Sequence, residues 1–296
     1  MKIDSLGILE KVSKINTNFF CESAWLDHGP FMNWLIKEIQ PRCLVELGSQ
    51  FGYSYFAGCQ AVLENRLPTK CFAVDTWEGD SQAGFYGDKE FAEVDQYNNS
   101  IYKDFSKLLR MKFNDAVKYF DSKSIDLLHI DGFHTYDAVS EDFNTWKDKL
   151  SENAIVLFHD IHEYRDDFGV HKFWKEIKEE FDTFEFFHEH GLGVLKFGDK
   201  PSPVDFLFDK SNSIEDLEIL RFIFKSAGAS NSLKFKLDSK DEIIEMYYLD
   251  SMRNLAKAEA VAAELANNKL AMDRLLHSVS WRLTSPIRKL RKLLPF

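Results

Sequence analysis

Short apolar runs recur along the first two thirds of the chain, and each is followed by a stretch with helical spacing. Strands that alternate with helices in this way are typical of an α/β protein with a parallel, doubly wound sheet. Helices are expected over residues 53–63, 102–109, 136–150 and 170–181. The expected parallel strands are residues 43–45, 70–74, 111–113, 125–131 and 154–158.

Two further apolar segments, 183–188 and 194–197, are separated by a turn that contains Gly191 and Gly193. Such a turn predicts a hairpin, and therefore an antiparallel edge on the parallel sheet. We expect a Rossmann-like, mostly parallel sheet of seven strands within residues 41–200. A helical cover is expected over residues 1–40, a helical cap over 201–250, and a heptad-like helix with a basic amphipathic tail over 251–296.

The first strand leads into a turn that contains two glycines, Gly48 and Gly52, after the acid Glu46. Glycine lets a backbone approach a ligand closely, and the start of the next helix leaves N–H groups without intrahelical partners. These features predict a nucleotide site, with an ordinary strand-to-helix turn as the alternative.

Polar residues follow each expected parallel strand, at the edge where open α/β sheets bind ligands. Asp75 follows Gly52 at about the spacing of the ribose-binding acid in nucleotide folds. Asp115 is placed either to reach an adenine amine or to cap the next helix. The full set is Glu46, Asp75, Asp115, Asp131 and the pair His159-Asp160.

Composition narrows the class of protein. The formal net charge is -11, which argues against a nucleic-acid partner. The four cysteines form no Cys-x-x-Cys pair, so neither a zinc site nor a redox pair is indicated, and a reduced cytoplasmic setting is expected. No apolar stretch approaches the length of a membrane span, and the N-terminus lacks the apolar core of a signal peptide.

Residues 45–198 resemble class I S-adenosylmethionine-dependent methyltransferases, and in particular the group associated with bacterial glycosyltransferases and surface-glycan biosynthesis. The segments that carry the resemblance are residues 74–80, 125–136, 157–161, 169–174 and 191–195. The resemblance implies S-adenosylmethionine as the methyl donor, with Gly48 and Gly52 beside its amino-acid part and Asp75 on its ribose. The implied cofactor contacts are Glu46, Gly48, Ser49, Gly52, Tyr53, Ser54, Asp75, Thr76, Trp77, Asp115 and Asp131.

The resemblance also implies a divalent metal between Asp131 and Asp160, with His159 as a third ligand. Magnesium prefers oxygen ligands, so a histidine in the set also admits manganese or zinc. The expected catalytic residues are His134 and Asp131, because His134 could take the proton of an acceptor hydroxyl near neutral pH. The alternative for His134 is a role in shaping its loop. Weaker candidates are His162, His171, His188 and His190.

The tail has its own pattern. Apolar residues with heptad spacing predict a coiled coil that joins copies of the chain, or a helix packed on its own domain. The last residues are basic and amphipathic, which indicates contact with the inner membrane face, or a solvated end. The heptad positions are Leu255, Ala258, Ala262, Leu265, Met272, Leu276, Val279 and Leu283.

These features together predict a cytoplasmic O-methyltransferase that acts on a sugar hydroxyl in cell-surface glycan biosynthesis. The expected partner is a sugar or glycan acceptor, with a homo-oligomer and peripheral membrane contact through the tail. The alternatives are methylation of a small nonsugar metabolite and a non-catalytic assembly protein of a glycan pathway.

Overall fold

The structure is a computed structural model that describes residues 3–165, 167–239 and 243–278. Seven strands form one sheet in the order β5-β2-β1-β6-β7-β9-β8. The first five run parallel to one another, and β9 and β8 are antiparallel to their neighbours. The predicted sheet is therefore confirmed. The strands are β1 (Cys43–Leu47), β2 (Lys70–Asp75), β5 (Ser106–Arg110), β6 (Ile125–Ile130), β7 (Leu150–His159), β8 (Asp182–Phe186) and β9 (Leu192–Lys196).

Helices cover both faces of the sheet, because side chains alternate along each strand between two apolar clusters. Leu44 belongs to one cluster and Val45 to the other. The first cluster joins α1 (Ser5–Val12), α2 (Gly29–Ile39), α3 (Tyr53–Glu64), α4 (Asp88–Ile101) and α8 (Ile214–Ser239). The second joins α5 (Phe113–Ala116), α6 (Tyr136–Trp146) and α7 (Val170–Ile177).

The structure corrects the prediction between residues 88 and 113. The expected helix over 102–109 is wrong, because residues 106–110 form β5 and pair in parallel with residues 71–75 of β2. The helix lies earlier, as α4, where the side chain of Glu90 accepts the backbone N–H of Gly87 and caps the first turn. The strand expected over 111–113 is therefore shifted by several residues, and Phe113 begins α5 instead.

The C-terminal helices extend the first face of the sheet. Helix α8 crosses the short helix η1 (Leu26–His28) so closely that a Cβ on Gly228 would lie 1.9 Å from the carbonyl oxygen of Asp27. Asn231 of α8 donates to the carbonyl of Leu26 at 3.3 Å. Helix α8 is thus attached to the N-terminal segment around η1, which borders the carboxyl edge of the sheet.

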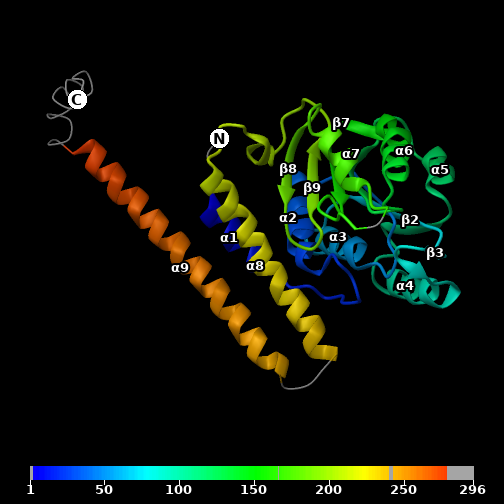
Figure 1. The fold of residues 1–296 in the computed structure, drawn as a ribbon, viewed down its shortest axis with the longest axis horizontal. Coiled ribbons are helices and arrows are strands. Elements are labelled where there is room, and N and C mark those ends of the chain that lie inside the picture. The colour runs from blue at the N-terminus through cyan, green and yellow to red at the C-terminus, as the bar shows by residue number, and fades with distance from the viewer. Residues whose placement is uncertain (1–2, 166, 240–242, 279–296) are drawn as a thin grey trace.

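Helix α9 (Ile243–His277) turns back along α8 and then extends beyond it (Figure 1). Of its heptad positions, Leu255 is half-buried and Ala258 and Ala262 are buried, whereas Leu265, Met272 and Leu276 are exposed. Val279 and Leu283 lie outside the described residues. No helix in the described part of the chain is long and apolar enough to cross a lipid bilayer.

Candidate functional site

A cavity of about 480 Å³ lies at the carboxyl edge of the parallel strands. Its volume falls within the range of small-molecule and cofactor sites. The loops that follow β1, β2, β6 and β7 form most of its wall, together with the hairpin of β3 (Gly79–Asp80) and β4 (Gly84–Phe85). Many residues that the sequence singled out line it: Gly48, Ser49, Gly52, Tyr53, Ser54, Asp75, Thr76, Asp131, His134, His159, Asp160 and His190.

The glycine turn lies directly against the end of β6. Gly48 has a φ of 85°, and a Cβ at this position would lie 2.0 Å from the carbonyl oxygen of Asp131. Gly52 has a φ of 87° and precedes α3, whose first N–H groups have no intrahelical partners. Glycine is therefore required at Gly48 both by the backbone conformation and by the space available.

Asp75 fixes the conformation of this turn. Its carboxylate accepts the backbone N–H groups of Ser49 at 2.9 Å, Gln50 at 3.0 Å and Trp77 at 2.7 Å. Gln50 and Trp77 have φ angles of 44° and 53°, a region that residues other than glycine rarely adopt. A carboxylate has about four lone-pair sites, so Asp75 keeps acceptor capacity for a ligand in the cavity that it lines.

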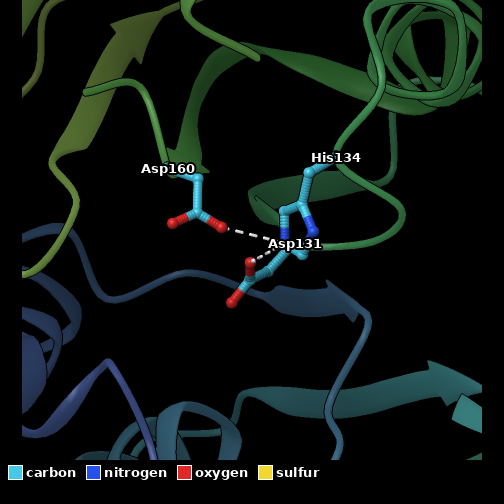
Figure 2. A group of neighbouring side chains, drawn as sticks. All are labelled: Asp131, His134 and Asp160. Atoms are coloured by element: carbon cyan, nitrogen blue, oxygen red, sulfur yellow. Dashed lines mark ion pairs between the residues drawn. The ribbon is translucent and has the colours of Figure 1, made fainter. Parts of the chain in front are cut away.

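Two carboxylates and an imidazole converge at the ends of β6 and β7 (Figure 2). Nε2 of His134 lies 2.9 Å from Oδ2 of Asp160 and 3.5 Å from Oδ1 of Asp131. One potential ligand atom from each residue lies within 4.8 Å of the other two. This arrangement of oxygen and nitrogen donors fits a divalent cation such as manganese or zinc, and it also fits magnesium with water in its remaining positions.

The charges in this cluster stabilise one another. Burial opposes protonation of His134, but hydrogen bonds to Asp131 and Asp160 outweigh it and raise the pKa of His134 to about 9. Burial also opposes ionisation of the two acids, yet the charge of His159 and the hydrogen bond from His134 hold both carboxyl pKa values below their ordinary range.

Gln82, in the hairpin between β3 and β4, fixes the orientation of the His134 ring. Its Oε1 lies 3.0 Å from both the backbone nitrogen and Nδ1 of His134, and its Nε2 donates to Asp167 at 2.7 Å. Because a carbonyl oxygen can only accept, Nδ1 must carry a proton. Nε2 is therefore the ring nitrogen that faces Asp131 and Asp160, as a proton donor or as a metal ligand.

His159 lies behind this cluster. Its Nε2 is 3.0 Å from the carbonyl oxygen of Glu189, and its Nδ1 is 3.4 Å from Oδ1 of Asp131 and 3.6 Å from Oδ1 of Asp160. The sequence named His159 as the third metal ligand, and its Nδ1 does face both carboxylates. The group whose ligand atoms all lie within 4.8 Å of one another, however, contains His134. His159 therefore borders the cluster through Nδ1, and its role as a metal ligand stays a prediction.

Three residues expected to contact the cofactor do not line the cavity: Glu46, Trp77 and Asp115. Glu46 lies 2.8 Å from Nδ1 of buried His129, its partner in the register of β1 and β6. Trp77 is fully buried and donates from Nε1 to the carbonyl of Gln50. Asp115 is on the exposed side of α5 and pairs with Lys118 at 3.0 Å.

Asp142 lines the cavity and was not predicted from the sequence. It lies on α6 at a spacing that places it on the same face as Val139, Phe143 and Trp146, and all four are buried. An acid among apolar positions of an amphipathic helix is the signal that could have identified it. His129 was missed as well, because its strand reads as a buried apolar run. His162, His171 and His188 do not line the cavity.

Comparison with known proteins gives one family match. The sequence pattern of a methyltransferase domain family matches residues 45–161, which contain the glycine turn, Asp75, Asp131, His134 and Asp160. The chain is also 36% identical over 274 residues to the uncharacterized protein y4gI of Sinorhizobium fredii. The alignment covers 93% of this chain and 29% of that much longer protein.

Solved structures similar to this chain include two methyltransferases. The Podospora anserina methyltransferase PaMTH1, solved with S-adenosylhomocysteine, is 17% identical, with a TM-score of 0.47 over 67% of this chain and 89% of its own. The O-methyltransferase TomG of Streptomyces achromogenes, solved with S-adenosylmethionine, is 14% identical, with a TM-score of 0.46 over 67% of this chain and 92% of its own.

Proposed function

We propose that this chain, which matches a methyltransferase domain family over residues 45–161, is a class I, S-adenosylmethionine-dependent enzyme that transfers the donor's methyl group to a sugar hydroxyl. The observation that carries the proposal is the cavity in which the glycine turn and the Asp131–His134–Asp160 cluster share one wall. We place the reaction in cell-surface glycan biosynthesis, on the resemblance of segments such as residues 125–136 to methyltransferases of that pathway.

The residues of the cavity suit S-adenosylmethionine. Because Gly48 has no side chain, the turn packs directly against the end of β6. The amino-acid part of the donor can then lie along the backbone of this turn. The remaining acceptor capacity of Asp75 suits the ribose hydroxyls. The N–H groups at the start of α3 suit the donor's carboxylate, because a helix N-terminus favours negative charge.

The acid and histidine cluster would serve the acceptor. Methyl transfer from a sulfonium requires an aligned acceptor oxygen and a group that takes its proton. In this proposal the hydroxyl lies beside the cluster. Its proton passes to the Asp131 carboxylate when Nε2 of His134 holds a metal, or to Nε2 of the neutral His134 ring when no metal is bound. A divalent cation bound by Asp131, His134 and Asp160 would lower the pKa of the hydroxyl.

A second hollow, of about 630 Å³, supports a sugar as the acceptor. It shares Gln50, Phe51, Tyr86 and His190 with the first cavity, so the two adjoin. The lining of the second hollow combines aromatic side chains with carboxylates, which suits a ligand that offers C–H faces and many hydroxyl donors. These residues are Glu22, Phe85, Glu90, Glu189 and Phe235.

The proposal is tested by mass spectrometry of glycans from cells with and without this chain, together with transfer of a labelled methyl group in vitro. One sugar is expected to lose the mass of one CH₂ for each missing methyl group. Treatment with a chelator should abolish transfer, and added Mn²⁺ or Mg²⁺ should restore it, because the acceptor hydroxyl is otherwise a weak acid.

Other outcomes would distinguish the alternatives. Labelling of a nonsugar metabolite alone would replace the sugar acceptor. Donor binding without transfer to any glycan-pathway acceptor would favour an assembly protein. Activity that is indifferent to chelator, with no metal found by elemental analysis, would refute the metal and leave His134 as the main catalytic candidate.

We further propose that the end of α9 joins copies of the chain and that the basic tail contacts an anionic membrane surface at the inner face. Beyond the buried Ala258 and Ala262, the heptad positions of α9 are exposed: Leu265, Met272 and Leu276. The basic residues lie outside the described residues, and each contributes about 1 kcal/mol near an anionic surface. They are Arg282, Arg288, Lys289, Arg291 and Lys292.

Truncation after Asn267 is expected to leave donor affinity and thermal stability unchanged, because Ala258 and Ala262 keep their contacts. It should lower the oligomer mass and the binding to anionic vesicles, measured by sedimentation and flotation. Truncation after Ser251 is the matched control, and it should also lower stability, since it removes the buried alanines. Equal sedimentation and equal vesicle binding before and after truncation at Asn267 would refute both roles.

A further inference from the structure

Asp142 is a buried carboxylate that the proposed chemistry does not use. Its side chain is 9% exposed and lies in the wall of the cavity. Within the described residues it has no hydrogen-bond or ion-pair partner. Burial, with a smaller effect from the charge of Glu141, raises the pKa of Asp142 to about 7. A buried polar group without a partner costs free energy, so a ligand that bonds to it would remove that cost.

The surroundings of Asp142 form a corner built from three elements. A Cβ added to Gly132, after β6, would lie 3.2 Å from Oδ2 of Asp142 and 2.6 Å from the ring of Phe113, at the start of α5. Beside this corner, Asn114 donates to Glu141 at 2.6 Å and ties α5 to α6. In this corner, which lines the cavity, an aromatic ring and an acceptor oxygen pack closely against a glycine.

The position of this corner suits one end of a nucleoside. In the sheet, β2 lies between β1 and β5. The glycine turn follows β1, Asp75 ends β2, and the chain after β5 leads to Phe113. A donor with its amino-acid part at Gly48 and its ribose at Asp75 would therefore have its base near Phe113 and Gly132. An adenine ring offers an apolar face to the ring of Phe113 and a 6-amino donor at its edge.

We propose that Asp142 accepts a hydrogen bond from the 6-amino group of the donor's adenine and thereby determines the specificity for the base. The inference rests on the proposed function, because it needs S-adenosylmethionine as the donor. It replaces Asp115, the acid that the sequence suggested for this amine, because Asp115 is exposed and paired with Lys118.

The test is calorimetric titration of the full chain with S-adenosylhomocysteine and with its purine analogue, which has hydrogen in place of the 6-amino group. The wild-type protein should bind S-adenosylhomocysteine about tenfold more tightly than the analogue, as expected for one hydrogen bond to a charged or acidic group. Asp142→Leu should bind the two ligands with affinities within about twofold of each other, because the acceptor is absent.

Asp115→Leu is the matched control and should keep the wild-type preference. Asp142→Asn keeps an acceptor oxygen in the same place and should keep part of the preference; thermal unfolding checks that each variant is folded. An equal preference in wild type and Asp142→Leu, or no preference in wild type, would overturn the inference while the proposed function stands. Absence of S-adenosylhomocysteine binding to wild type would overturn both.

Discussion

Replacing Asp75 by alanine is expected to weaken the binding of S-adenosylhomocysteine by about 100-fold. The carboxylate accepts three backbone N–H groups, from Ser49, Gln50 and Trp77, and each loses its acceptor in the variant. An unsatisfied buried N–H costs about 1–3 kcal/mol, and a tenfold change in affinity corresponds to about 1.4 kcal/mol. Calorimetric titration of the folded variant measures the effect.

The loss should exceed that of a single ligand contact because Asp75 also holds two unusual backbone conformations. Gln50 and Trp77 adopt positive φ angles, which persist only where the surrounding contacts impose them. Glu78→Ala is the control, since this exposed acid lies three residues further along and does not line the cavity. Donor affinity of Asp75→Ala within about threefold of wild type would show that neither the turn nor the ligand depends on this carboxylate.

Glu46→Ala is expected to lower the free energy of unfolding by about 3–5 kcal/mol, measured by urea denaturation. Glu46 and His129 are 1% and 0% exposed, and 2.8 Å separates Oε2 of Glu46 from Nδ1 of His129. The hydroxyl of Ser49 donates to the other carboxylate oxygen at 2.6 Å. Removing Glu46 leaves both partners without an acceptor inside the sheet.

A second variant separates the lost acceptor from the lost packing. Replacing Glu46 and His129 together by leucine removes both buried polar groups, so the double variant should be more stable than Glu46→Ala. Glu46→Gln keeps an acceptor oxygen and should fall between wild type and alanine. A loss of less than about 1 kcal/mol for Glu46→Ala would show that the pair does not hold β1 to β6.

The elements predicted correctly from sequence are those whose pattern reflects burial on both sides. The strands expected over residues 43–45 and 125–131 were recognised because they belong to β1 and β6, which are central strands of a parallel sheet. Strand β5 is an edge strand, with Lys107 and Arg110 beside its two leucines, so its apolar run is too short to recognise. Helix α4 was missed because Val94 and Asn98 are its only fully buried residues, and its sequence reads as a polar loop.

The sequence located the edge of the sheet where the candidate site lies, but not which side chains point into the cavity. The end of a strand can be located from sequence, so Asp75, Asp131 and Asp160 were placed at the right edge. The direction of a side chain depends on cross-strand partners far away in sequence, so the pairing of Glu46 with His129 could not be predicted. Asp142 approaches the cavity only because α6 packs beside the end of β6, a tertiary contact without a local motif.

The most direct test of the central claim is a crystal structure of the full chain with S-adenosylhomocysteine. The amino-acid part of the ligand should lie along the turn from Gly48 to Gly52 and the ribose on Asp75. The adenine should lie beside Phe113 and Gly132, with its amine on Asp142. The sulfur should face Asp131 and His134. A ligand bound elsewhere, or no ligand in the cavity at saturating concentration, would contradict the assignment of this cavity as a methyl-donor site.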